Sequence, residues 1–394
     1  MAFVKPDAAS FAKIKVFGVG GGGGNAINSM IEDEQIKEVE FVAVNTDVQA
    51  LLANKASTKI QIGENLTRGL GSGGDPEIGF KAAEESREKI KEYLVDTDML
   101  FMAGGMGGGT GTGGMPVIAE LAKENGTLSI AVVTKPFVFE GTRRMVIAEE
   151  GIEKLKEKVD TLIIIPNQRI MEVIDQKMTL VEAFKVIDGV LGQAVQGISD
   201  IITAPGLINV DFADVRSIMS NAGSSLLGIG TGVGEKKAQA AARAAISSPL
   251  LDVSIEGAKG ILFNVIGGPD LTMAEVNEAA QEISQVADAD ANIRFGAIID
   301  EGMIDQVKII VIATGFDETR SRLAKMVARP VRPPEVPEGI LGEKPEAPFA
   351  IQSADLKESE KKAEKKEEPK KPKEISPDEF GEEFDIPAFL RQGK

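Results

Sequence analysis

Short apolar runs alternate with helical patterns through the first half of the chain. Between Ile14 and about Asp175 these runs are KIKVFGVG, VEFVAVNTD, KIQIG, DMLFMA, LSIAVVT and TLIIIP. Continuous apolar strands separated by helices are typical of a parallel sheet covered on both faces. We therefore expect an α/β domain of Rossmann-like type that binds its ligand at the carboxyl ends of the strands.

A long helix is expected after these strands. Thr179 and Glu182 match the T-x-x-E capping box, and Pro205-Gly206 would end the helix. Apolar residues recur at spacings of three and four: Leu180, Phe184, Ile187, Leu191, Val195, Ile198 and Ile202. Because other apolar residues fall outside this stripe, we expect the helix to be buried between two layers.

The pattern changes again after this helix. Up to residue 317, short helical stretches, one of them capped by Thr272 and Glu275, alternate with the runs SSLLGIG, GILFNVIGG, NIRFGAIID and QVKIIVIATGF. This mixture predicts a second, smaller α/β domain.

The C-terminal part has a different composition. After Arg329 the chain is rich in Pro, Lys and Glu, cannot bury a core and is predicted to be a disordered linker. The final DEFGEEFDIPAFLRQGK regains apolar residues, which indicates a peptide that orders on binding a partner.

Composition limits the chemistry. The chain has 394 residues without histidine or cysteine, which excludes an imidazole base, a thiol nucleophile, disulfides and the usual nitrogen–sulfur zinc site. Any metal would be a hard, oxygen-bound ion such as Mg²⁺ carried in with a phosphate substrate. The net charge of -17 disfavours binding to nucleic acid or anionic lipid. With no bilayer-length apolar run and no secretory signal, we expect a cytoplasmic protein.

Three glycine-rich loops follow predicted strands. The first is Gly18–Asn25, the second contains Gly71, Gly73 and Gly74, and the third is GGMGGGTGTGG at 104–114. Glycines let the backbone approach an anion, and successive N–H groups at a helix start converge on phosphate. The third loop has more glycines than a tight turn needs. The three loops together predict a nucleoside triphosphate site, with the helix after the third loop beginning near Pro116.

Alternatives remain open on these residues alone. The first loop fits G-x-G-x-x-G, so a nicotinamide or flavin oxidoreductase with Asp47 at the ribose is one alternative. It leaves GGGTGTG and the tail unexplained. A filament protein that binds nucleotide without turnover is another. Asp211 and Asp214 fit a helix N-cap and a first-turn acid as well as a catalytic pair. No G-x-x-x-x-G-K-[ST] is present, so this is not an ordinary P-loop protein.

Five motifs resemble those of the tubulin/FtsZ family, in particular its bacterial cell-division members. They are KIKVFGVGGGGGNAINSMI, GGGTGTG, KPFVFEGTRRM, GLINVDFADVRSIMSNAGSSLLGIG and DIPAFLRQ, and the likeness covers about residues 13–317 plus the last dozen or so. The resemblance implies a GTPase that polymerises head to tail into filaments of the division ring. The implied organisation is a flexible N-terminus 1–12, a GTP-binding domain 13–178, a central helix 179–204, a GTPase-activating domain 205–317, a linker 318–376 and an adaptor-binding peptide 377–394.

The resemblance also implies roles for single residues. Those at the nucleotide and its phosphates would be Gly21, Gly22, Gly23, Gly24, Asn25, Gly108, Gly109, Thr110 and Gly111. Glu140 and Arg144 would lie at the ribose and phosphates, and Asn167 in the same site. Asp188 would bind guanine, because one carboxylate can accept from both N1–H and N2–H. The catalytic group would be Asn209, Asp211 and Asp214, which enter the site of the next subunit and polarise the attacking water.

The implied ligands and partners follow from the same likeness. GTP would be the substrate and GDP the product, with Mg²⁺ carried by the nucleotide. The partners would be further copies of this chain, together with membrane-adaptor and regulatory division proteins bound through 377–394. We expect no nucleic acid partner and no direct membrane insertion. The protein would concentrate at midcell.

Overall fold

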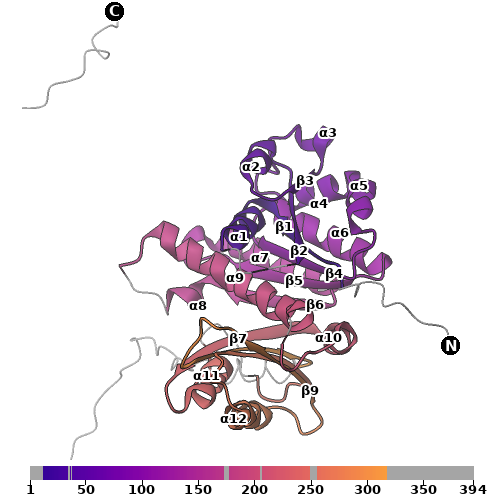
Figure 1. Cartoon of the computed structure of the whole chain (residues 1–394). Coiled ribbons are helices and arrows are strands. Elements are labelled where there is room, and N and C mark those ends of the chain that lie inside the picture. Colours follow the sequence, from indigo (N-terminus) through magenta and orange to yellow (C-terminus); the bar gives the residue numbers. More distant parts are fainter. Residues whose placement is uncertain are drawn as a thin grey trace, which may run out of the picture. The chain divides into compact units, whose positions relative to one another are not determined.

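The computed structural model describes residues 12–33, 36, 38–172, 177–204, 206–248 and 255–316 (Figure 1). The predicted linker 318–376 and peptide 377–394 lie outside these residues. The first elements are β1 (Ile14–Val19), α1 (Gly20–Glu32), β2 (Val39–Asn45), α2 (Val48–Ala53), β3 (Thr58–Gln61), α3 (Glu64–Thr67), α4 (Pro76–Glu85), α5 (Arg87–Leu94), β4 (Met99–Gly105), α6 (Thr110–Glu124), β5 (Leu128–Lys135), η1 (Val138–Glu140), α7 (Thr142–Lys156), β6 (Thr161–Pro166) and α8 (Asn167–Met171).

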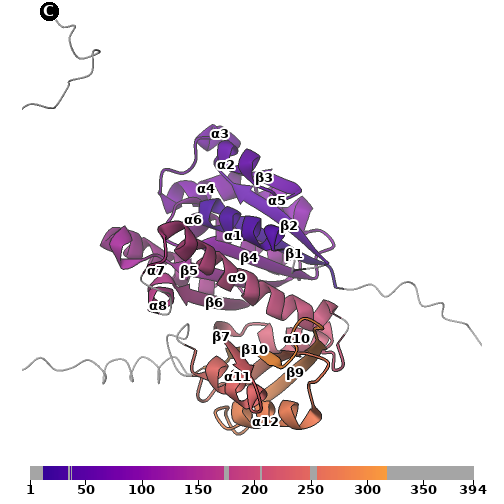
Figure 2. The same cartoon turned by 60° about the vertical axis from the view of Figure 1, so that its left-hand side comes forward.

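The second half of the described chain is built around a smaller group of strands. Its elements are α9 (Leu180–Thr203), α10 (Phe212–Met219), β7 (Gly223–Val233), α11 (Lys237–Ile246), β8 (Gly260–Gly267), α12 (Met273–Ser284), β9 (Asn292–Ile299) and β10 (Gln306–Thr314). Figure 2 shows α11 and α12 against β7–β10, apart from the helices of the first half.

The strands form one sheet in the order β3-β2-β1-β4-β5-β6-β7-β10-β8-β9. Strands β1 to β6 pair in parallel, which confirms the predicted parallel sheet. The strand β7 is the junction: its first residues pair in parallel with β6, and the rest pair antiparallel with β10. The second half combines helices with parallel and antiparallel strands, which fits the predicted smaller α/β domain, but its strands continue the sheet of the first half.

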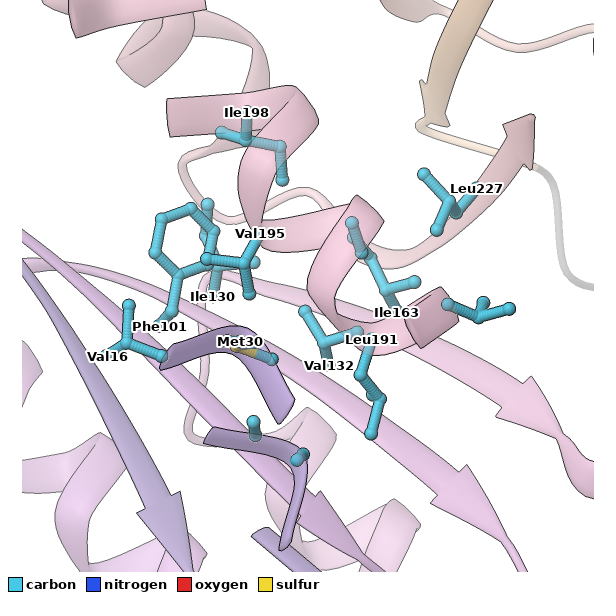
Figure 3. Packing of buried hydrophobic residues seen from close by; sticks show 14 of the residues in the cluster. Val16, Met30, Phe101, Ile130, Val132, Ile163, Leu191, Val195, Ile198 and Leu227 are labelled. Atoms are coloured by element: carbon cyan, nitrogen blue, oxygen red, sulfur yellow. The ribbon is translucent and has the colours of Figure 1, made fainter. Parts of the chain in front are cut away.

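Both faces of the parallel sheet are buried. Side chains alternate along each strand, so neighbouring residues enter different clusters. In β1, Val16 packs in a cluster with α1 and α9, whereas Phe17 packs on the other face with α4 to α7. Figure 3 shows the first cluster, in which Val195 of α9 lies near Phe101 and Ile130 of the sheet, and Leu191 lies nearer Val132 and Ile163. This double burial explains why the strands read as unbroken apolar runs.

The helix α9 joins the two halves. Its predicted capping box is present, since Thr179 Oγ1 accepts from the N–H of Glu182 and the Glu182 carboxylate accepts from the N–H of Thr179. From Ile187 to Ile201 the apolar residues are buried as expected, and Ile202 is partly buried. The expectation is wrong for the first turns: Leu180 is exposed, and Phe184 is still 40% exposed although its ring meets that of Phe137 edge-on, with 5.6 Å between centroids.

The helix after the third glycine loop begins at Thr110, not near Pro116 as expected. The last part of the glycine run, Thr110–Gly114, is therefore helical, while Gly104 and Gly105 end β4. Close packing explains the exception to glycine's poor helix propensity: a Cβ on Gly113 would stand 2.0 Å from the carbonyl oxygen of Pro76 in α4. The second loop also differs, because α3 lies between β3 and Gly69–Gly74.

Candidate nucleotide site

A cleft of about 580 Å³ opens at the carboxyl ends of β1, β2 and β4. The residues lining it are Val19, Gly20, Gly21, Gly22, Asn45, Thr46, Asp47, Ala50, Gly71, Ser72, Gly74, Gly105, Gly107, Gly108, Gly109, Thr110, Gly111, Glu140, Arg143, Arg144 and Ile147. All three predicted glycine loops therefore meet in one place. This is the end of a parallel sheet where ligands bind.

Six of the residues predicted to contact the nucleotide do not line this cleft: Gly23, Gly24, Asn25, Gly73, Asn167 and Asp188. Gly24 and Asn25 line a smaller adjoining hollow of about 170 Å³, which shares Gly20 and Gly21 with the cleft. Gly23 is buried against β4, since a Cβ there would stand 2.3 Å from the carbonyl oxygen of Ala103. Close packing therefore requires a glycine at position 23.

Two helix N-termini point into the cleft. The helix α1 begins at Gly20 and α6 begins at Thr110, and a Cβ on Gly20 would stand 3.0 Å from the backbone nitrogen of Gly111. Glycine therefore allows the two helix starts to converge. Free N–H groups and the helix dipoles favour an anion at this point. Gly108 has nothing within 4 Å of its Cβ position and is open to the cleft.

A cluster of three hydroxyl groups ties the loops together. Thr110 Oγ1 lies 2.7 Å from Thr46 Oγ1 and 3.0 Å from Ser72 Oγ, and all three residues are buried. Sequence reasoning missed Thr46 and Ser72. The usable signal was their position, since Thr46 directly follows the end of β2 and Ser72 stands among the glycines of the second loop.

The charged wall of the cleft comes from η1 and α7. Glu140 Oε2 lies 2.7 Å from Arg144 NH1, and Glu140 Oε1 accepts from the N–H of Phe137 at 2.8 Å. These contacts fix the carboxylate. Arg143, which the sequence analysis did not single out, also lines the cleft. Two guanidinium groups at one rim favour ligands that carry phosphate.

Two further predicted residues are polar. Asp188 lies in the N-terminal half of α9, and Asn167 is the first residue of α8. Asp188 is half-buried, and burial raises the pKa of its carboxyl group to about 6. Asn167 is buried, and its Oδ1 has no hydrogen-bond partner among the described residues. An unsatisfied buried acceptor costs free energy, so Asn167 needs a donor.

The predicted catalytic residues lie elsewhere, in the segment before α10 and in the first turn of that helix. Asp211 caps α10, because its Oδ1 accepts from the N–H of Asp214 at 2.7 Å. Asn209 Oδ1 accepts from the N–H of Gly206 at 2.8 Å. The carboxylate of Asp214 is bound by Arg294, with 2.9 Å from Nε to Oδ1. None of these residues lines the cleft.

Comparisons with known proteins identify both halves of the chain. Residues 13–175 match the tubulin/FtsZ family GTPase domain, and residues 223–317 match the FtsZ family C-terminal domain. The solved FtsZ dimer of M. jannaschii, described as empty, is 49% identical; the match covers 78% of this chain and 89% of that chain, with a TM-score of 0.74. A mutant of the M. jannaschii FtsZ gives the same identity over 92% of its length, with a TM-score of 0.75.

A more distant likeness extends the fold match. CetZ2 of Haloferax volcanii, solved as a GTPγS-bound protofilament, is 21% identical with a TM-score of 0.68, and the match covers 81% of this chain and all of that one. At this identity the match shows the fold alone. Among the described residues, no helix has the length and apolar character needed to cross a bilayer.

These matches decide between the alternatives. The loop Gly18–Asn25, which also fitted an oxidoreductase, lies inside the matched GTPase domain, so GTP and GDP are the ligands that the family implies. The chain is therefore a GTPase of a polymer-forming family. On the two domain matches and the 49% identity to FtsZ, the chain belongs to the tubulin/FtsZ family.

Proposed function

We propose that this chain hydrolyses GTP while it polymerises head to tail, and that the next subunit completes each active site. The observation that carries the proposal is the separation of the glycine-lined cleft from Asn209, Asp211 and Asp214. These residues follow α9, whose 24 residues span about 36 Å at 1.5 Å per residue. The acids therefore need the cleft of another molecule.

The geometry of such a contact determines the assembly. One face carries the cleft and a different face carries the loop with Asp211 and Asp214, so the contact is heterologous and repeats into an open filament. The solved dimer of the 49% identical FtsZ supports self-association of this chain. Filament formation is then the condition for turnover.

In the cleft and in the segments beside it, each group of residues would receive one part of the nucleotide. The N–H groups at the starts of α1 and α6 would bind the phosphates, with Gly108, Gly109 and Thr110 nearest to them. Glu140 and Arg144 would bind the ribose and phosphates. Asp188 would accept from guanine, and the unpartnered Oδ1 of Asn167 would accept a donor of the nucleotide. The remaining predicted residues, Gly71, Gly73, Gly74, Gly111 and the Gly21–Asn25 segment, would complete the backbone cradle.

Hydrolysis needs positioning and charge stabilisation rather than a covalent step. Asn209, Asp211 and Asp214 of the neighbouring subunit would hold the attacking water in line with the γ-phosphate. Mg²⁺ would enter with the nucleotide and be held mainly by phosphate oxygens. The cleft offers hard oxygen donors for its remaining shell, among them Asp47 and the Thr110 hydroxyl.

The biological setting is part of the proposal. The likeness to FtsZ supports a role in cell division, with filaments at midcell in the cytoplasm. Residues 377–394 would bind membrane-adaptor and regulatory division proteins through their apolar side chains.

A concentration series of GTPase activity tests the proposal. Activity per molecule should vanish below a threshold concentration and rise above it, and Asp214→Ala should bind GTP but hydrolyse almost none. Constant activity per molecule down to concentrations where the protein is monomeric would contradict a shared site. An Asp214→Ala protein with normal turnover would contradict the role of that acid.

A further inference from the structure

The ion pair between Arg294 and Asp214 joins two elements that lie far apart in the sequence. Arg294 is the third residue of β9, and its Nε lies 2.9 Å from Asp214 Oδ1 in the first turn of α10. The Asp214 side chain is 37% exposed and that of Arg294 is 44% exposed. The pair thus stands at the surface, where a bound carboxylate can still reach a second molecule.

The strand β9 holds the loop before α10 as well. Leu207 N–H donates to the carbonyl oxygen of Ala297 at 2.9 Å, and Ala297 N–H donates to that of Ile208 at 3.0 Å. Because side chains alternate along a strand, Arg294 shares a face with Gly296, whose Cβ position lies 3.5 Å from the carbonyl oxygen of Ile208. One strand therefore fixes both the backbone of the loop and the carboxylate of Asp214.

We propose that Arg294 is a positioning residue for hydrolysis: it holds the Asp214 carboxylate in the orientation that receives the water at the neighbouring subunit's GTP. This rests on the proposed function of Asp214. A carboxylate on an exposed first turn samples several rotamers, and one charge-assisted hydrogen bond selects among them before assembly. Prior orientation of a catalytic group raises the rate without changing ground-state binding.

Other readings of the pair fit less well. Exposed ion pairs contribute little to folding stability, so a purely structural role gives a weak reason for the contact. The nearest alternative cation on α10, Arg216, donates to the carbonyl oxygen of Gly126 at 2.8 Å and is engaged away from Asp214. Arg294 is thus the cation that the structure gives to this acid.

The test compares Arg294→Gln with Arg294→Lys and with Arg243→Gln. Arg243 of α11 forms an exposed pair with Glu282 of α12, at 2.8 and 3.1 Å, and serves as the matched control for removing a surface arginine. Each full-length variant is measured for GTP affinity, assembly threshold, melting temperature and GTP turnover per polymerised subunit. A double variant with Asp214→Ala is measured in parallel.

Arg294→Gln should lower turnover per polymerised subunit roughly tenfold or more, with threshold and GTP affinity unchanged. Arg294→Lys should recover part of the loss, and Arg243→Gln should turn over normally. Arg294→Gln should add nothing to the loss in Asp214→Ala.

Three results would overturn the proposal: unchanged turnover in Arg294→Gln; a raised threshold with normal turnover per polymerised subunit, which indicates a filament contact only; or a larger drop in melting temperature than the control together with lost GTP binding, which indicates a structural role. Normal turnover in Asp214→Ala would instead refute the proposed function itself.

Discussion

At the scale of single residues, the glycines of the cleft divide into two groups. Some are required by packing: a Cβ on Gly113 would collide with Pro76, and one on Gly109 would stand 2.2 Å from Ser72 Oγ. Others, such as Gly108, face open space. The first group allows α6 to approach α4, and the second leaves room for phosphate.

This division predicts different defects for two alanine substitutions. Gly113→Ala should lower the free energy of unfolding by about 1–3 kcal/mol, the usual cost of overpacking. Gly108→Ala should fold normally but weaken GTP binding, because the added methyl group takes space at the phosphate; displacing one N–H···phosphate hydrogen bond would cost about 1.5–3 kcal/mol. Denaturant unfolding and nucleotide titration measure the two effects. Equal defects in both variants, or normal binding by Gly108→Ala, would contradict the assignment.

Asp188 predicts a pH dependence of nucleotide binding. Its carboxyl pKa is raised to about 6, and only the ionised form accepts both guanine donors. GTP binding near pH 6 should therefore release a proton, and affinity should fall as the pH drops below 6. Calorimetry in two buffers of different ionisation enthalpy measures the release. Asp188→Asn is the control and should bind more weakly with less proton release; identical release in both proteins would exclude this role.

The same pKa predicts the direction of a stability change. The ordinary pKa of this carboxyl is 3.8, so between about pH 4 and 6 the folded state holds more protons than the unfolded state. The stability of the nucleotide-free protein should then decrease as the pH rises through this interval. Asp188→Asn should lose less stability across it. A steeper decrease in the variant, measured by urea unfolding, would contradict the assignment.

The sequence predicts site residues best where chemistry leaves a dense local signal. The glycine loops and Glu140 with Arg144 could be found because each belongs to a motif. Thr46 and Ser72 gave only a weak signal, their position at a strand end and among glycines, because their hydroxyl groups matter only once Thr110 is brought within 3.0 Å. That proximity depends on the order of β1, β2 and β4 in the sheet.

At the scale of elements, the capping boxes were predictable and the start of α6 was not. A T-x-x-E motif works through contacts within four residues, so it holds wherever the helix packs. The start of α6 depends on a neighbour distant in the sequence. Glycines that disfavour an isolated helix become favourable when α4 packs closely against them.

Two capping boxes with the same geometry allow one substitution to serve as the control for the other. Thr179 in α9 and Thr272 in α12 make the same three hydrogen bonds, at 2.8, 2.8 and 3.3 Å. Replacing either with alanine should lower stability by about 1 kcal/mol. Only Thr179→Ala should also weaken GTP binding, because the first turns of α9 carry Asp188. Normal binding by Thr179→Ala would show that α9 does not border the nucleotide. Equally weakened binding by Thr272→Ala would show that the effect is not specific to α9.

At the scale of the whole molecule, α9 and β7 connect the cleft-bearing half to the acid-bearing half. The β6–β7 pairing was not predictable, because it joins strands that the sequence assigns to separate domains. Each chain carries both a cleft and the acids that follow α9. In the proposed mechanism, the acids of one chain act at the cleft of the next chain.

The predicted C-terminal peptide belongs to this scale too. Deleting residues 377–394 should leave GTPase activity and polymerisation close to those of the full chain, because the deletion removes none of the described elements, the last of which is β10. The deletion should abolish binding to adaptor proteins, since it removes the peptide's apolar residues. Sedimentation and GTPase assays measure the first effect and a pull-down the second. Loss of folding or of hydrolysis would place the peptide in the folded core.

The shared active site is tested most directly by mixing two inactive variants. Gly108→Asp places a carboxylate where phosphate should bind, with open space around its Cβ, and keeps Asp214 intact. Asp214→Ala keeps the cleft intact. Each alone should hydrolyse almost no GTP, and a mixture should recover turnover wherever a Gly108→Asp subunit presents its Asp214 to the GTP of an Asp214→Ala subunit. A mixture that co-assembles, as shown by co-sedimentation, but stays inactive would contradict hydrolysis shared between subunits.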